Sequence, residues 1–292
     1  MDTATSAPAP PDRISPTKRR IHLGRWGVHA VLLAYSLLAL GPTLLIIMNS
    51  LKSRSAIFDD AFSLPTSETF DLVGYDTVLN GSSFDVYFRN SFIVTVASVL
   101  LVVFFSAMAA FALAEYDFKG NTMLALYLAI GIMIPIRLGT VSILKLMVSL
   151  GLINTLWALI LVYTAMGLPL GVFLMTQFMR QVPRELKSAA RVDGANEYRV
   201  FGLVLPLVRP GMAAVAVFTM LPVWNDLWFP LILAPAEDTR TVTLGASAFL
   251  GQFERNWNAL LAALTLAMVP IILLYVIFSR QFLRGLTEGA IK

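Results

Sequence analysis

Long apolar runs are the feature that most restricts what this chain can fold into. A helix needs about 20 predominantly apolar residues to cross a bilayer, and several runs reach that length. The chain is 57% hydrophobic and only 14% charged, which is typical of an integral membrane protein rather than a soluble domain. The clearest candidate spans are Val28–Met48, Phe92–Ala114, Leu156–Met175, Met212–Leu233 and Ala259–Phe278.

One shorter apolar run needs separate treatment, because it ends at Pro135 and Arg137. We predict a span over Asn121–Ile136, followed by a partly embedded outer-face helix within Leu138–Ile153. The chain is then an all-α integral membrane protein with six transmembrane helices. The predicted domains are a disordered basic cytoplasmic tail over 1–27, a six-span transmembrane domain over 28–280 and a cytoplasmic C-terminal tail over 281–292.

The distribution of basic residues predicts the orientation. If the N-terminus is inside, 15 of the 22 Lys and Arg residues fall in inner segments. This bias places both termini in the cytoplasm. The acidic loop Asp59–Asp85 and the loop Ala234–Asn258 then lie outside, and the polar segment Pro183–Pro210 lies inside.

The segment Pro183–Pro210 is too long and too charged to be a simple turn between spans. Pro183 suits the first turn of a helix, and Gly194 can adopt the left-handed conformation that ends one. A second short helix is expected over Asn196–Leu203. One interpretation is an amphipathic helix lying on the anionic inner leaflet. The other is a docking element for a cytoplasmic protein.

The letters SAARVDGANEYRVF…LPLVRP favour docking, because they resemble the EAA loop of binding-protein-dependent ABC importer permeases. We call residues 183–210 the EAA-like loop. In that family the loop docks onto a cytoplasmic ATP-binding subunit. Ser188 stands where the family has Glu. Glu185, one turn earlier, is expected to replace that Glu in a salt bridge with the ATPase. The resemblance implies ATPase-docking roles for Glu185, Ser188, Ala189, Ala190, Asp193, Gly194 and Ala195.

Further stretches are similar to the maltose-permease G-type subunits of carbohydrate importers. They are Gly151–Thr155, Trp224–Asp226 and the ending Arg284–Lys292. The resemblance implies a permease subunit in a bacterial plasma membrane that imports a sugar, expected to be a di- or oligosaccharide. It also implies a second related permease, two cytoplasmic ATP-binding subunits and an extracytoplasmic solute-binding protein as partners, with the lipid bilayer around them and no nucleic acid.

Polar residues occur inside the fifth predicted span, where Asp226 lies between Pro222 and Pro230. A charge at the centre of a membrane helix costs about 2.5–3.5 kcal/mol on insertion scales, so it should face a cavity, water or a partner. Trp224, Asn225 and Asp226 suit a neutral sugar and are candidate residues of the substrate pathway. The alternative is a kinked helix in which Asn225 and Asp226 cap a break without contacting substrate.

The last outer loop contains Phe249, Phe253 and Arg255, which are candidate contacts for the binding protein. An interfacial aromatic belt is an equally good interpretation of these residues. Arg137 and Lys145 lie near the outer surface, where snorkelling to the interface is the default expectation.

The sequence has no phosphate-binding G-x-x-x-x-G-K-[ST] motif and no cysteine. We therefore expect no enzyme activity, metal site or bound cofactor in this chain, with ATP used by the partner subunit. Two alternatives are a stand-alone secondary carrier or channel, and a membrane scaffold. A carrier would need coupling-ion residues in the spans, and Asp226 is the only carboxylate well inside one.

Overall fold

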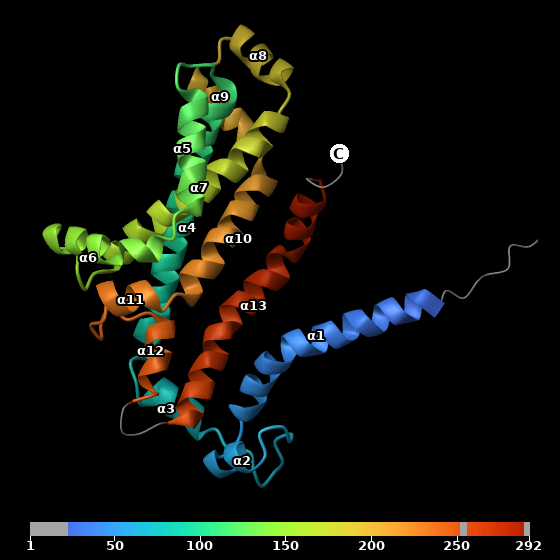
Figure 1. Ribbon diagram of the computed structural model, residues 1–292, viewed down its shortest axis with the longest axis vertical. Helices are drawn as coiled ribbons and strands as arrows, with labels where there is room; N and C mark the ends of the chain where they lie inside the picture. The colour runs from blue at the N-terminus through green and yellow to red at the C-terminus, as the bar shows by residue number, and fades with distance from the viewer. Residues whose placement is uncertain (1–22, 252–255, 289–292) are drawn as a thin grey trace, which may run out of the picture. The chain divides into compact units, whose positions relative to one another are not determined.

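The computed structural model describes the backbone of residues 23–251 and 256–288, with the side chains of residues 27–251 and 256–273. These residues form helices, and the single antiparallel bridge among them joins Lys52 and Phe70. The helices, labelled in Figure 1, are α1 (Leu23–Asn49), α2 (Arg54–Asp59), α3 (Val73–Asn80), α4 (Phe84–Glu115), α5 (Asn121–Met133), η1 (Ile136–Gly139), α6 (Thr140–Ser149), α7 (Leu156–Gln181), α8 (Arg184–Val192), α9 (Glu197–Val204), α10 (Arg209–Asn225), α11 (Trp228–Leu233), α12 (Val242–Ala248) and α13 (Trp257–Glu288).

Most of helix α1 belongs to a unit of its own, which comprises residues 1–44. Its apolar side chains are exposed, among them Val31, Tyr35 and Leu38. A helix that is apolar on its outside fits hydrocarbon better than water. The stretch Gly27–Asn49 is also long and apolar enough to cross a membrane.

Helices α4 and α7 pack closely at the centre of the second unit, residues 45–292. A Cβ atom on Gly167 would lie 2.7 Å from Cγ2 of Val102, and one on Gly171 would overlap the Ser106 side chain. Small residues allow membrane helices to approach this closely. The absence of side chains on Gly167 and Gly171 therefore sets the distance between α4 and α7.

A buried apolar cluster attaches α9 to the long helices. It combines Val200 and Val204 of α9 with Val102, Met175 and Val215 of α4, α7 and α10. Figure 1 shows α8 and α9 together at one end of the bundle that α4, α7 and α10 form. Because α9 is packed in this way, the EAA-like loop is fixed to the spans.

The predicted spans are largely present as apolar helices. Three helical stretches, in α1, α4 and α7, are each long and apolar enough to cross a membrane. The number rises to five if the pair α5 with η1–α6, bent by 86°, and the pair α9 with α10, bent by 75°, each count as one span. Within α13 the described apolar part, Trp257–Leu273, is shorter. The number of six spans stays a prediction.

The predicted continuous span Met212–Leu233 is wrong in one respect. Helix α10 ends at Asn225, and a separate short helix, α11, begins at Trp228. The break has a physical cause, because the Asp226 carboxylate accepts hydrogen bonds from backbone N–H groups at the start of α11. The predicted separation of Asn121–Ile136 from the following outer helix is confirmed, with α5 ending at Met133, two residues before Pro135.

The two segments predicted to be outer loops contain helices. The acidic segment Asp59–Asp85 includes α3, and the segment Ala234–Asn258 includes α12. Helix α3 packs on α13, and the Asn258 side chain donates a hydrogen bond of 2.7 Å to the Lys52 carbonyl. Both helices have eight residues or fewer, which is too short for their periodicity to be recognised in the sequence.

Candidate functional site

The EAA-like loop forms a helix, a glycine turn and a second helix, as predicted. Gly194 has φ of +81°, in the left-handed region that favours glycine. The Ala195 N–H donates to the Ala190 carbonyl at 2.9 Å, and the Gly194 N–H donates to the Arg191 carbonyl at 3.0 Å. These two bonds form a Schellman motif at the end of α8. The Asn196 side chain then caps α9 by accepting from the Arg199 N–H.

Ion pairs attach α8 to the end of α4. Glu115 is the last residue of α4, and its carboxylate pairs with Lys187 and, at 2.8 Å, with Arg191. The Lys187 side chain is only 6% exposed. Removing one partner of a buried pair is strongly destabilising, because the other charge stays buried without compensation. Glu115 therefore holds α8 in place through a contact that spans more than seventy positions of sequence.

A second carboxylate, Glu197 of α9, connects the two helices of the loop. Its oxygens accept hydrogen bonds from Arg191 at 2.8 and 3.0 Å and from the Tyr116 hydroxyl at 2.6 Å. The bonds from Arg191, then that from Tyr116, lower the pKa of Glu197 to about 2. Burial and the bond to Glu197 raise the pKa of the Tyr116 hydroxyl to about 12. The network thus keeps its charges throughout the physiological pH range.

The sequence did not indicate Glu115, and it pointed to Glu185 as the compensating carboxylate. Glu185 is exposed, and its side chain has no hydrogen bond or ion pair with any described residue. The only available signal was a charge at the end of an apolar run, since nothing local relates Glu115 to Lys187. The predicted substitution of Glu185 for the missing Glu concerns a salt bridge with the ATPase subunit, so it stays a prediction.

The predicted docking residues divide between two faces. Ala190 and Ala195 are partly buried and pack against the cluster that contains Val200 and Val204. The docking roles predicted for Ala190 and Ala195 stay predictions, and both residues also contribute to the packing of the loop against the spans. The outward face carries the remaining predicted docking residues, Glu185, Ser188, Ala189, Asp193 and Gly194, which are all exposed.

Two large apolar side chains stand on the outward side of the loop. Val192 is 87% exposed and Tyr198 is 84% exposed. They lie on either side of the Gly194 turn and are more exposed than the other large apolar side chains of the loop, Leu186, Leu203 and Leu207. Exposed apolar residues with a polar rim mark interaction sites. The sequence analysis did not single out Val192 or Tyr198.

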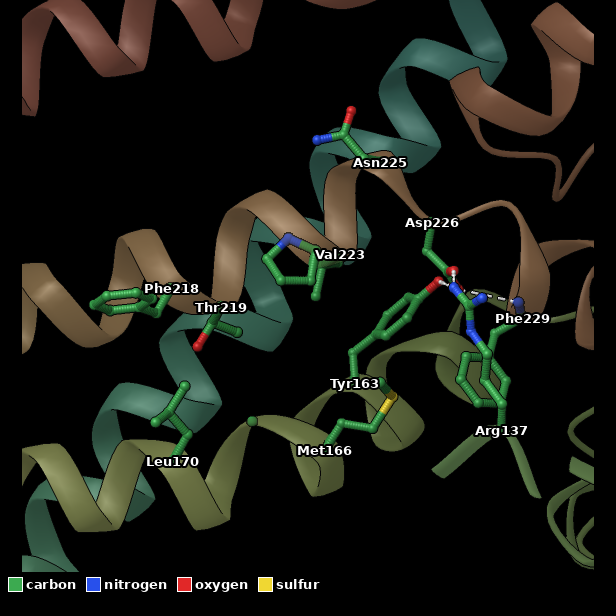
Figure 2. A pocket seen from close by; sticks show the side chains of 12 residues that line it. Arg137, Tyr163, Met166, Leu170, Phe218, Thr219, Val223, Asn225, Asp226 and Phe229 are labelled. Atoms are coloured by element: carbon green, nitrogen blue, oxygen red, sulfur yellow. Dashed lines mark hydrogen bonds and ion pairs between the residues drawn. The ribbon is translucent and has the colours of Figure 1, made fainter. Parts of the chain in front are cut away.

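A cavity of about 410 Å³ lies between α7 and α10, next to η1 and to the break between α10 and α11 (Figure 2). We call it the α7–α10 cavity. Asp226 lies at one end of it, and Asn225 also lines it. The other lining residues are Arg137, Tyr163, Met166, Gly167, Leu170, Phe218, Thr219, Pro222, Val223 and Phe229.

Asp226 is the most highly connected polar group of the cavity. Its carboxylate accepts hydrogen bonds from the Tyr163 hydroxyl at 2.8 Å and from the Phe229 N–H at 3.0 Å. A guanidinium nitrogen of Arg137 lies 3.7 Å away. Figure 2 shows Tyr163 and Arg137 converging on this carboxylate from different elements. Asp226 thus caps the helix break, as the alternative of a kinked helix predicted, and it also lines a cavity.

Trp224 and Asn225 point in different directions. Trp224 is buried, and its indole N–H donates to the Ala267 carbonyl of α13 at 3.0 Å. It also packs edge-on against Phe88, with ring centroids 5.6 Å apart. Among the three candidate pathway residues, Asn225 and Asp226 line the cavity and Trp224 does not. Tyr163 is buried in the core of the spans and also lines the cavity.

Arg137 and Trp228 connect the two broken helices. The Arg137 guanidinium lies 5.9 Å from the centroid of the Trp228 ring, and the Trp228 indole N–H donates to Thr140 at 3.0 Å. Arg137 belongs to η1 and Thr140 to α6, whereas Trp228 begins α11. Snorkelling alone does not describe Arg137, although 70% of its side chain is exposed. Lys145 is exposed, as expected.

The candidate contacts for a binding protein are described only in part. Phe249 follows α12, is partly buried and packs against the cluster that contains Trp224 and Val242. Phe253 and Arg255 lie outside the described residues. The proposed contact of this loop with a binding protein therefore stays a prediction.

The fold and these two features define a class of protein, a helical membrane protein with a cavity between its long helices and an exposed helix–glycine–helix segment at one end. Residues 106–288, more than half of the chain, match the family described as binding-protein-dependent transport system inner membrane component. The chain belongs to this family of transport permeases, which are not enzymes. It is accordingly a multi-pass protein of the plasma membrane.

Curated relatives support the same assignment over nearly the whole chain. The diacetylchitobiose uptake system permease protein NgcG of Streptomyces coelicolor is 34% identical over 90% of this chain and 88% of its own length. The arabinooligosaccharides transport system permease protein AraQ of Halalkalibacterium halodurans is 34% identical over 87% of this chain and 92% of its own. The predicted resemblance to permeases of carbohydrate importers is confirmed.

A solved structure has the same fold. It is a crystal structure of a bacterial ABC transporter involved in the import of the acidic polysaccharide alginate, with a TM-score of 0.80. The match covers 92% of this chain and 100% of that chain, at 22% sequence identity. The predicted all-α membrane fold is thereby confirmed.

Proposed function

We propose that this chain is one of two permease subunits in an ATP-driven importer of an oligosaccharide. The observation that carries the proposal is the EAA-like loop, which ends the bundle with an exposed face and is held to α4 by Glu115. Relatives named for the uptake of diacetylchitobiose, arabinooligosaccharides and starch degradation products support the substrate class. Membership of this family speaks against the stand-alone carrier and the scaffold.

The assembly we propose contains a second related permease, two ATP-binding subunits in the cytoplasm and an extracytoplasmic solute-binding protein. Both termini and the EAA-like loop face the cytoplasm, as the distribution of Lys and Arg favours. ATP is bound and hydrolysed by the partner subunits, and this chain binds no cofactor of its own. The outward face around Ala189 and Gly194, flanked by Val192 and Tyr198, docks onto the ATPase.

Coupling proceeds through the contacts that attach the loop to the spans. When the ATP-binding subunits close, α8 and α9 move as one unit, because Arg191 and Glu197 connect them. Glu115 transmits the displacement to α4, and Val200 and Val204 transmit it to α7 and α10. Packed helices have discrete arrangements, so the displacement moves the spans between inward-facing and outward-facing states.

Sugar passes along the α7–α10 cavity. Asn225, Asp226 and Thr219 offer hydrogen-bonding groups, and Phe218 offers an aromatic face. Sugars combine hydroxyls with apolar C–H faces, so they suit a cavity with a few polar groups among aromatic and aliphatic side chains. We assign Asn225 and Asp226 to the pathway and give Trp224 a supporting role through its bond to α13. Phe249, Phe253 and Arg255 are proposed to contact the binding protein.

The proposal is tested by purifying the tagged full-length chain from native membranes and identifying the co-purified proteins by mass spectrometry. We expect a P-loop ATPase and a second permease of the same family. An Ala189→Trp variant should lose the ATPase but keep the second permease, because Ala189 faces outward. Recovery of the chain alone, in a detergent that preserves other importers of this family, would refute the assembly.

A further inference from the structure

A polar pocket of about 480 Å³ lies at the same end of the bundle as the EAA-like loop, and none of the exposed residues predicted to dock onto the ATPase lines it. It forms where α4 ends, α5 begins, α7 ends and α8 begins. Its lining comprises Leu113, Ala114, Asp117, Phe118, Asn121, Thr122, Arg180, Val182, Arg184 and Lys187. We call it the basic pocket, because three of the four charged residues that line it are cations.

Two of these cations are free to bind an anion. Lys187 is already paired with Glu115. Arg180 and Arg184 are exposed, and neither side chain has an ion pair or hydrogen bond with any residue that the structure describes. Asp117 is the one acidic residue in the lining. The pocket thus has two uncompensated guanidinium groups, whose planar donors match the geometry of a phosphate.

An apolar groove of about 290 Å³ continues from the basic pocket between α5 and α7. The two cavities share Leu113, Thr122 and Arg180. Beyond these the groove is lined mainly by apolar side chains, namely Ala125, Leu126, Leu128, Ala129, Val172 and Phe173, with Thr176 and Gln177. A ligand that fills both must have an anionic head and an apolar tail.

We propose that the basic pocket and the groove together bind one anionic glycerophospholipid. The phosphate lies between Arg180 and Arg184, and Asp117 accepts a hydrogen bond from a hydroxyl of the headgroup. One acyl chain lies in the groove along Ala125 and Ala129. Basic pockets between helices on the cytoplasmic side of a membrane are suited to anionic headgroups. In the proposed orientation the lipid belongs to the inner leaflet.

One interpretation of the EAA-like loop, from its sequence, is an amphipathic helix on the anionic inner leaflet. The proposed lipid site is a specific contact of this kind. Arg184 is the first residue of α8, and Lys187 is one turn further along the same helix. A bound phosphate therefore contacts α8 directly, next to the Glu115 pair that holds it. The lipid and the ATPase bind different faces of the loop. The inference does not depend on the oligosaccharide or on the ATPase, so it is tested separately.

The first test measures binding of dioleoylphosphatidylglycerol to the full-length chain in detergent micelles by native mass spectrometry. We expect the Arg180→Gln/Arg184→Gln variant to bind this lipid about 25-fold more weakly, from the loss of two cations near the phosphate. The matched control is Arg199→Gln/Arg209→Gln, which removes the same charge from two exposed residues outside the pocket. Equal loss in both variants would indicate only general attraction and would overturn the site.

The second test separates a lipid from a free phosphate. Ala129→Trp fills the groove and should weaken lipid binding, whereas Ile130→Trp, an exposed neighbour outside the lining, should not. Glycerol 1-phosphate should fail to displace the lipid at millimolar concentration, and dioleoylphosphatidylcholine should bind more weakly. Displacement by glycerol 1-phosphate together with an ineffective Ala129→Trp would reduce the site to an anion site and refute the lipid proposal.

Discussion

The EAA-like loop and the α7–α10 cavity are built in opposite ways. Most of the loop's shape comes from neighbours in sequence, as in the Gly194 turn, and distant contacts of Glu115, Tyr116 and the cluster around Val200 attach it to the spans. The cavity is almost entirely long-range, because Asp226, Tyr163 and Arg137 come from three separate elements. The turn of the loop therefore depends on its own residues, whereas any shift of α7 against α10 changes the cavity. The coupling that we propose uses this difference.

Replacing Gly194 should have the largest effect, because it disrupts the turn on which the shape of the EAA-like loop depends. At φ of +81° a β-branched residue is strained, so Gly194→Val should abolish uptake while the chain still inserts in the membrane. Uptake of radiolabelled sugar in whole cells measures the effect. The control is Gly202→Val, which changes a glycine of α9 with nothing within 4 Å of the added Cβ position. Wild-type uptake by Gly194→Val would rule out the docking role.

Removing Glu115 should have the next largest effect. Glu115→Ala leaves Lys187 buried without a partner, which destabilises the attachment of α8 by about 3 kcal/mol. We expect faster proteolysis within residues 184–204 and at least tenfold lower uptake, with α4 and α7 still protected. The matched control is Glu68→Ala, because Glu68 lies outside the loop, is exposed and has no side-chain partner among the described residues. Equal effects would mean that the pair does not anchor the loop.

Asp226 separates the capping role from the cavity role. Asn caps helices about as well as Asp, so Asp226→Asn should keep the α10–α11 break and lose only the charge opposite Arg137. Asp226→Ala loses the cap as well, at about 1 kcal/mol. We expect uptake to fall several-fold for Asp226→Asn through a higher KM, and further for Asp226→Ala. If Asp226→Asn keeps wild-type KM and rate, Asp226 is a cap and nothing more.

The smallest expected effect is a dependence of the stability of the EAA-like loop on pH. The pKa of Glu197 falls from its ordinary value of 4.5 to about 2, so its contribution is complete above pH 4.5 and is lost as the pH falls toward 2. Hydrogen exchange of residues 184–204, corrected for intrinsic rates, should be constant from pH 8 to 5. The acid-induced increase should be smaller in Glu197→Gln than in the wild type. A change between pH 8 and 6 that Glu197→Gln removes would contradict this assignment.

The sequence was most informative where structure depends on close neighbours. It predicted the glycine turn at Gly194, with short helices on either side of it, and the separation of the outer helix after Pro135. Turn chemistry and hydrophobic periodicity act over a few residues, so these features are readable in one dimension. The resemblance of the same segment to the EAA loop identified the family of transport permeases, which the comparisons confirm.

The sequence was least informative about the direction in which individual side chains point. Trp224, Asn225 and Asp226 are consecutive, yet Trp224 faces α13 while the other two line the cavity. Ala189 and Ala190 likewise point outward and inward. Successive residues of a helix are rotated by about 100°, and which side meets a neighbour depends on how the helices pack. Side-chain chemistry alone does not contain that information.

Sequence by itself determined that this chain is a helical membrane protein with a helix–glycine–helix segment between its spans, because apolar run length and turn residues act locally. Only the tertiary structure decided which charges meet. Glu115 pairs with Lys187 and Asp226 with Arg137 across separate elements, and their meeting requires α4, α7 and α10 to be packed first. A charge buried among spans needs a partner, but which partner it finds is settled by packing.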